Sequence, residues 1–241
     1  MTTSPALMAR HKRWVANHFK GKVKELDYQL MTLVDACDHS LALFTASAET
    51  AAGNGAAVTY SFSALANVVQ TMKDAVKTVT GHQLNWSDIN ALRHGAFLHA
   101  ARNAITHDGN PVVSAWADGR YYVPAKIIRI GRQGEIITID PPLDDIRTVC
   151  LAFASDFCGL VSNALTGVVG EPDLAGSIFD IADLDEFFAE SLIIPDSVKA
   201  IFASNRDQVV AEMESTIHDP TSDTITMLAE LALRCEARLR V

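Results

Sequence analysis

The chain has 241 residues, of which 49% are apolar and 20% are charged. This apolar share is too high for a disordered chain and is ordinary for a globular protein. The sequence has no uninterrupted apolar run of about 18 residues and no apolar stretch typical of a secretory signal, so we expect a cytoplasmic protein outside the membrane.

The charge of the chain is unevenly distributed. The formal net charge is −9, yet residues 1–24 contain six Lys and Arg residues and no acid, whereas residues 140–241 contain 19 acids and 6 bases. A local basic strip can guide a phosphate backbone even in an acidic protein. We expect residues 1–22 to form a basic arm in which Arg13 and Lys20 contact phosphates, the alternative being a solvated terminus without a ligand.

Three helices are predicted in the first half of the chain. Apolar residues recur at three- and four-residue steps over residues 23–48 and again over residues 63–80, where Gly81 ends the pattern. The glycines at 53 and 55 lie between these helices and indicate a flexible connection. The third helix follows the capping residue Asn85 and is expected to continue to about residue 108.

The segment 112–140 has the character of β-structure. Two strand-like runs flank Asp118-Gly119, a pair typical of a type I′ hairpin, and a third run follows a turn that contains Gly134. Pro124 lies inside the second run, where it indicates a sheet edge or a bulge. The sequence therefore predicts an antiparallel β-meander of about three strands, inserted between helices.

The rest of the chain is predicted to be helical. A fourth long helix is expected over residues 143–165, and shorter helices over residues 181–190, 197–214 and 222–239. The fold class is therefore mainly α. We expect a helical domain over residues 23–165 that carries the β insert, followed by an acidic helical C-terminal extension over residues 166–241.

The end of the third predicted helix carries a pattern of polar residues. An arginine followed at short spacing by a histidine occurs three times in the chain: Arg13–His18, Arg93–His99 and Arg102–His107. Only the last pair combines a polar neighbour, Asn103, with a histidine at a helix end. On an α-helix, His99, Arg102, Asn103, Thr106 and His107 all fall within about 140° on one side.

This arrangement resembles the signature of the HEPN superfamily: an arginine, a polar neighbour, and a histidine after about four to six further residues, at the end of a helix in a helical bundle. The resemblance implies an HEPN-like helical bundle and a metal-independent endoribonuclease without a cofactor. It also implies that RNA is the substrate and that two such helices face each other in a homodimer. Relatives often serve in toxin–antitoxin or antiviral defence, which implies an antitoxin or regulatory protein as a possible partner.

The residue types suit this chemistry. Histidine titrates near neutral pH, so His107 can exchange a proton with the 2′-OH or the leaving oxygen. Arg102 offers a charged fork to the phosphate, and Asn103 can orient either group. His99 and Thr106 lie on the same side and are expected to contact substrate. Because Arg102 and His107 diverge by about 140° on a helix, we expect a partner helix to complete the site.

A second interpretation gives the same residues purely structural roles. His107 can cap the helix, and Arg102 can pair with an acid of another helix. The chain would then be a non-catalytic module that binds a nucleotide, RNA or a protein. No spacing typical of a metal site is present, and we expect no bound metal. The cysteines lack a C-x-x-C pair and are expected to be buried, reduced thiols: Cys37, Cys150, Cys158 and Cys235.

Overall fold

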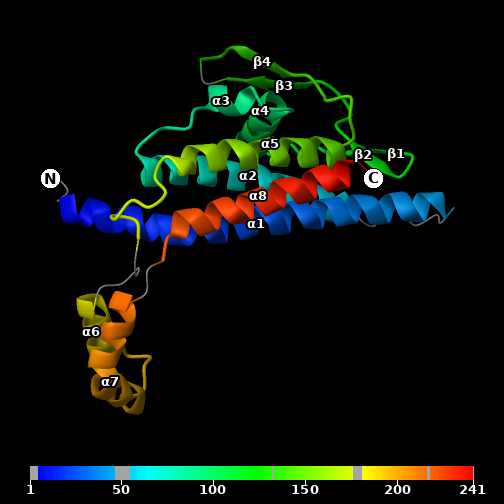
Figure 1. Cartoon of the computed structure of the whole chain (residues 1–241). Helices are drawn as coiled ribbons and strands as arrows, with labels where there is room; N and C mark the ends of the chain where they lie inside the picture. The colour runs from blue at the N-terminus through cyan, green and yellow to red at the C-terminus, as the bar shows by residue number, and fades with distance from the viewer. Residues whose placement is uncertain (1–4, 47–54, 132, 176–180, 216–217, 241) are drawn as a thin grey trace.

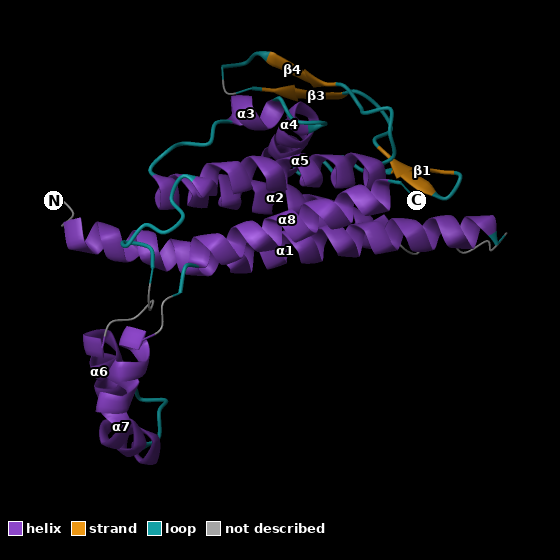
Figure 2. Ribbon diagram, in the orientation of Figure 1, coloured by secondary structure: helices purple, strands orange, loops and turns teal. Residues whose placement is uncertain are grey.

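The computed structural model describes residues 5–46, 55–131, 133–175, 181–215 and 218–240, and these residues are mainly α-helical (Figures 1 and 2). Four short strands lie between the fourth and fifth helices: β1 (Ala115–Ala117), β2 (Arg120–Tyr122), β3 (Ile127–Ile130) and β4 (Ile136–Ile139). The helices are α1 (Pro5–Thr45), α2 (Gly55–Thr80), α3 (Trp86–Asn90), α4 (Gly95–Asp108), α5 (Ile146–Thr166), α6 (Ile181–Glu190), α7 (Asp196–Ser215) and α8 (Pro220–Leu239). The predicted fold class, mainly α with a small β insert, is confirmed.

Four long helices, α1, α2, α5 and α8, lie side by side and enclose the core (Figure 1). Helix α5 contributes Phe153 and Phe157, which are fully buried. By length and composition α5 is apolar enough to cross a membrane, and it is the one such helix among the described residues. More than half of its apolar window is buried inside the bundle, which accounts for its composition.

The four cysteines are buried in this bundle and unpaired, as the sequence predicts. Cys37 lies on α1, Cys150 and Cys158 lie on α5, and Cys235 lies on α8. Burial raises the pKa of the Cys37 and Cys235 thiols to about 12. The thiols are therefore protonated at neutral pH, and they pack as small apolar side chains.

Helix α1 begins earlier than predicted. It starts at Pro5 and includes the basic residues that we expected to form a separate arm over residues 1–22. The reason is that Ala16 and Phe19 are buried and extend the apolar stripe of α1 toward the N-terminus. Lys and Arg residues alternate with these buried positions and make the apolar pattern difficult to recognise in the sequence. They lie on the outer face of α1, where a surface helix carries polar residues.

The predicted third helix is broken into α3 and α4. His94 adopts a left-handed conformation with φ of 58°, and a Cβ at the next residue, Gly95, would collide with the carbonyl oxygen of Ile89. Only glycine fits there, so the chain turns between the two helices. Asn85 forms a capping box with Asp88 at the start of α3, consistent with its predicted capping role. All five polar residues of the candidate site lie on α4.

The β insert is two separate hairpins and not one meander. Strand β1 pairs with β2 across Asp118-Gly119, and β3 pairs with β4, both antiparallel (Figure 2). The run that we predicted as one strand is interrupted around Pro124, which cannot donate a ladder hydrogen bond. The first hairpin lies against the end of α1, where Trp116 Nε1 donates to Ser40 Oγ (3.0 Å). The second hairpin lies over α4.

The region expected as one C-terminal extension has two different parts. Helix α8 packs along α5 and α1 and belongs to the bundle. Helices α6 and α7 form a hairpin that projects from the bundle (Figure 1), joined by the stacked rings of Phe188 and Phe202 and by the ion pair of Asp185 with Arg206. Near its base, the backbone N–H of Gly170 donates to Asp219 Oδ2 (3.1 Å), so the chain leaves and re-enters the bundle at one place.

Candidate functional site

The C-terminal half of α4 and the β3–β4 hairpin enclose an open groove of about 650 Å³. Helix α4 contributes Arg102, Asn103 and His107 to its lining, and the hairpin contributes Arg129 and Glu135 among others. The three residues that the sequence predicts as catalytic are therefore brought together on one chain. A partner helix is not needed to place Arg102 and His107 in the same groove, although the two side chains start from different sides of α4.

Arg102 presents unused hydrogen-bond donors to this groove. Its Nη1 donates to Asn103 Oδ1 (3.0 Å), while its Nε is buried and has no hydrogen-bond partner in the described part of the chain. No ion pair joins Arg102 to an acid of the described residues, so the alternative role as a structural ion-pair partner finds no acid there. A buried unpaired donor is costly, and because this Nε is closed to solvent, an anion would reach it only if the groove wall moved.

His107 lies in the last turn of α4, which ends at Gly109 in a left-handed conformation (φ 65°). The His107 side chain is exposed and lines the groove. Beside it, Asp108 Oδ2 accepts a hydrogen bond from Arg129 Nε (2.6 Å), and this bond holds the pKa of Asp108 below its ordinary value. The ion pair ties β3 to the end of α4 and fixes the second wall of the groove next to His107.

The sequence does not identify Arg129 as a site residue. It lies on β3 between the exposed residues Ile128 and Ile130, and only 12% of its own side chain is exposed. A cation that alternates with exposed isoleucines points to the opposite face of the strand from them. That pattern is the available signal, but it does not reveal that α4 lies on that face.

The side chains of His99 and Thr106 contact α3 and α2, respectively, and are not among the groove-lining residues. The His99 ring stacks on Trp86 with centroids 3.8 Å apart, and its Nδ1 donates to Asn90 Oδ1 (3.1 Å). Burial, followed by the cations of Arg102 and Lys73, lowers the pKa of His99. Thr106 Oγ1 donates to the side-chain oxygen of an α2 residue, Asn67 (3.3 Å).

Arg13 and Lys20 lie on α1 and do not line the groove. Arg13 Nε donates to the carbonyl oxygen of Asp173 (3.2 Å), and the neighbouring Lys12 pairs with Glu171 (2.6 Å). Part of the basic strip is therefore engaged by the chain itself. Lys20 has no hydrogen-bond or ion-pair partner within the described residues.

Within the described ranges, no group of three or more His, Cys, Asp or Glu side chains is gathered in a way that could hold a metal ion. The groove offers a cationic fork, an amide and an exposed imidazole. This combination can bind a phosphate and exchange a proton. Comparison of the chain with models of protein families, with curated proteins and with solved structures found no match.

Proposed function

We propose that the protein is a metal-independent endoribonuclease of the HEPN type. The observation that carries the proposal is the placement of the Arg102 guanidinium, with its unpaired buried Nε, in the same groove as the exposed imidazole of His107. A phosphate of RNA would accept hydrogen bonds from Arg102. His107 would exchange a proton with the 2′-OH or the leaving oxygen, and Asn103 would hold the guanidinium in place.

The proposed reaction needs a group that exchanges protons and a cation that stabilises negative charge. It needs no metal because His107 and Arg102 would supply these two groups. The 2′-oxygen attacks the adjacent phosphorus, the bond to the 5′-oxygen breaks, and the proton of the 2′-OH leaves while the departing oxygen gains one. The products are a 2′,3′-cyclic phosphate and a 5′-hydroxyl. Arg102 stabilises the negative charge that develops on the phosphate oxygens, a role that a preorganised cation in a partly buried site performs well.

The wider context of the proposal comes from the same resemblance. We propose a homodimer with α4 at or near the interface, and a role as a toxin or antiviral defence effector with an antitoxin or regulatory protein as partner. His99, Thr106, Arg13 and Lys20 are proposed to contact RNA outside the groove. For Arg13, RNA would have to compete with the carbonyl oxygen of Asp173.

The test is cleavage of end-labelled RNA by purified protein in excess EDTA. General acid–base help is worth roughly 10²–10⁴ in rate, so His107→Ala should lose about that factor. Arg102→Lys should recover little, because the planar fork is lost, and Asn103→Ala should lose less than either. His82→Ala, a change at an exposed histidine in the α2–α3 connection, is the matched control and should keep full activity.

Cleavage that requires added magnesium, or that survives His107→Ala unchanged, would contradict the proposed mechanism. If the protein binds RNA and cleaves none under any condition, the non-catalytic binding module becomes the better description. Circular dichroism of each variant establishes that the loss is not caused by unfolding.

A further inference from the structure

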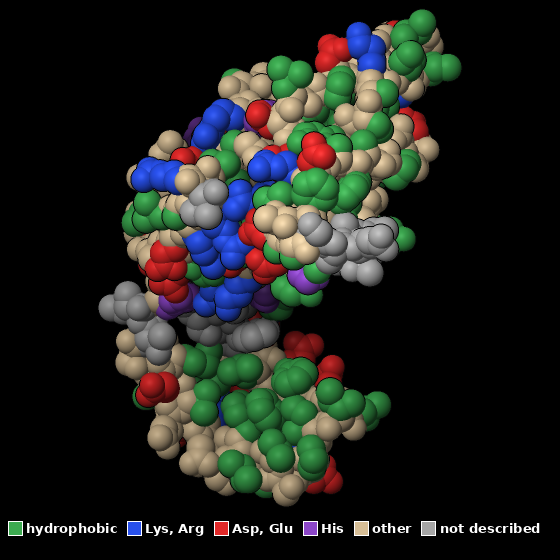
Figure 3. Space-filling model, turned by 90° about the vertical axis from the view of Figure 1, so that its right-hand side faces the viewer, with side chains coloured by type: hydrophobic (Ala, Val, Ile, Leu, Met, Phe, Trp, Pro, Cys, Tyr) green, Lys and Arg blue, Asp and Glu red, His purple; other side chains and the backbone are tan. Residues whose placement is uncertain are grey.

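The α6–α7 hairpin exposes an apolar surface. Neither helix contains a buried residue, and Phe187 is 51% exposed. Leu192, Ile193 and Ile201 are still more exposed. Figure 3 shows hydrophobic side chains gathered over this part of the molecule, at the lower end of the view. A two-helix unit with such a surface gains stability when another element covers it.

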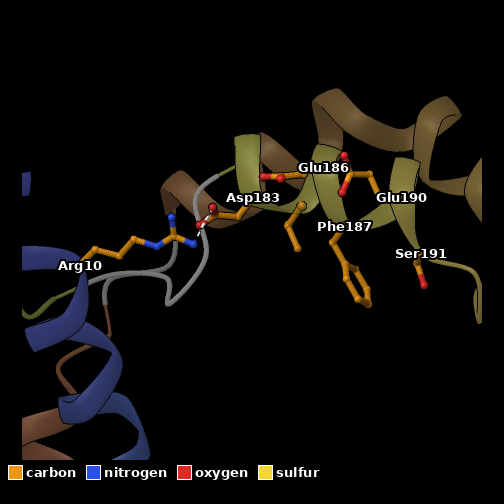
Figure 4. Close-up of a pocket in the computed structure, with 7 residues that line it drawn as sticks. Arg10, Asp183, Glu186, Phe187, Glu190 and Ser191 are labelled. Atoms are coloured by element: carbon orange, nitrogen blue, oxygen red, sulfur yellow. Dashed lines mark ion pairs between the residues drawn. The ribbon is translucent and has the colours of Figure 1, made fainter. Parts of the chain in front are cut away.

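The hairpin is also strongly acidic. Residues 181–215 contain eight acids and two bases. Glu186 and Glu190 lie one turn apart on α6, beside Phe187 (Figure 4). Neither glutamate has a hydrogen-bond or ion-pair partner among the residues that the structure describes. The occupant of this surface should therefore be basic as well as able to pack against a phenylalanine ring.

Helix α1 carries a matching surface. Gly21 is exposed, and a Cβ placed on it would meet nothing within 4 Å, so a large side chain has room above it. Lys20 and Lys24 flank Gly21 and have no partner in the described ranges. Tyr28, one heptad beyond Gly21, is 68% exposed and extends the same face of the helix.

On both surfaces, the charged residues have the same sequence spacing around a central residue. On α1, Lys20 precedes Gly21 by one residue and Lys24 follows it by three. On α6, Glu186 precedes Phe187 by one residue and Glu190 follows it by three. When two helices pack antiparallel, residues with the same sequence offset from the central residue of each helix project to the same side of the contact. With Phe187 over Gly21, Lys24 then lies opposite Glu186, and Lys20 lies opposite Glu190.

We infer that α6 of one copy of the chain packs antiparallel across α1 of a second copy. Within its own chain the hairpin does not make this contact, because it lies beside Arg10, about three helical turns before Gly21. It meets its own α1 near the N-terminus, where Asp183 pairs with Arg10 (2.7 Å, Figure 4), and from there it projects away from the bundle (Figure 1). The second copy returns the same contact, which gives a two-fold, isologous dimer. The contact uses no residue of the α4 groove, so the chemistry proposed for the groove does not depend on it. It is an alternative to the dimer through α4 proposed above, and a dimer that persists in the variants below would be the α4 dimer.

The experiment is sedimentation velocity of the full chain at micromolar concentration, with two charge-reversed variants. One carries Glu186→Lys and Glu190→Lys, and the other carries Lys20→Glu and Lys24→Glu. The wild type is expected to dimerise. Each variant alone faces like charges across both contacts, so its dimerisation should weaken by at least about tenfold. An equimolar mixture of the two variants faces opposite charges at both contacts and should dimerise again.

The matched control carries Glu214→Lys and Glu230→Lys at exposed positions outside the contact. It changes the net charge as much as the Glu186→Lys, Glu190→Lys variant does, and it should dimerise like the wild type. Phe187→Asp tests the apolar part and should produce a monomer. The inference is overturned if the wild type is a monomer, or if it dimerises and the charge-reversed variants do so equally well. Failure of the mixture to restore the dimer would also overturn it.

Discussion

The two arginines of the groove use their donors differently. Arg129 makes two hydrogen bonds to Asp108, which neutralises its charge and fixes the β3–β4 hairpin. Arg102 makes one hydrogen bond, to the neutral Asn103, and retains a buried unpaired Nε. Arg102 is therefore the groove cation without an ion pair among the described residues, although the carboxylate of Glu135 lines the same groove. An anion that enters the groove meets a guanidinium that still has donors to offer.

His99 should make the stability of the protein depend on pH. Burial and two nearby cations lower its pKa in the folded state, whereas the unfolded chain binds a proton with the ordinary pKa of about 6.5. The unfolded state therefore gains more from protonation, and the free energy of unfolding should fall as the pH drops below about 6.5. Urea unfolding at pH 7.5 and pH 5 measures this decrease.

The comparison for this pH effect is His99→Phe, which keeps an aromatic ring on Trp86 and removes the titrating group. This variant should lose less stability than the wild type between the two pH values. Equal losses in both proteins would show that other groups cause the pH dependence.

At the residue scale, the sequence predicts the polar sector of α4 but not its surroundings. Arg102, Asn103 and His107 are recognisable from their spacing and their place near a helix end. Arg129 and the pairing of Thr106 with Asn67 depend on which elements pack against α4, and short-range patterns carry no such information. The angular separation of Arg102 and His107 is also misleading, because long side chains from different sides of a helix reach one groove.

At the scale of single elements, Asp145 is the main anchor of the N-terminus of α5. Its Oδ1 accepts hydrogen bonds from the backbone N–H groups of Arg147 (3.0 Å) and Thr148 (3.2 Å). Its Oδ2 accepts hydrogen bonds from Thr148 Oγ1 (3.0 Å) and Arg120 Nη1 (3.1 Å). One carboxylate, 8% exposed, therefore caps the core helix and also holds β2 against it.

Replacing this carboxylate should destabilise the bundle. Asp145→Ala removes the cap and leaves its donors unpaired, so the free energy of unfolding should fall by about 2–3 kcal/mol. Asp145→Asn keeps an acceptor at the cap and should lose about 1 kcal/mol. Asp144→Ala is the control at a neighbouring exposed residue and should change stability by less than about 0.5 kcal/mol. Denaturant unfolding checks the order, and similar losses at Asp144 and Asp145 would contradict it.

The bounds of a helix are predicted well where a periodic apolar pattern determines them. They are predicted poorly where a single backbone position determines where the helix breaks. Helices α6, α7 and α8 lie within two residues of their expected bounds. The break before α4 depends on the close approach of Gly95 to Ile89, a contact that exists only after folding. The division of the β insert depends on Pro124. The sequence shows that a proline disturbs the second strand-like run, but it does not decide whether the result is a sheet edge, a bulge or an interruption.

At the scale of the whole molecule, the α6–α7 hairpin is an insertion into a bundle that is complete without it. The two helices contribute no buried residue, and the bond of Gly170 to Asp219 closes the bundle at the base of the hairpin. At a protein concentration low enough to keep both proteins monomeric, replacing residues 176–217 by a short Gly/Ser linker should therefore leave the thermal midpoint of unfolding within about 3 °C of that of the full chain. Calorimetry measures the midpoint, and a fall of more than about 10 °C would mean that the hairpin supports the bundle.

The burial of all four cysteines has a practical consequence for labelling. Their thiols are protonated and enclosed. We therefore expect the folded protein not to react with alkylating reagents, which attack exposed thiolates. A cysteine introduced on the surface would consequently be modified alone, without removal of the native ones. Paramagnetic or fluorescent probes can thus be attached singly to α1, to the groove or to the projecting hairpin of the otherwise unaltered chain.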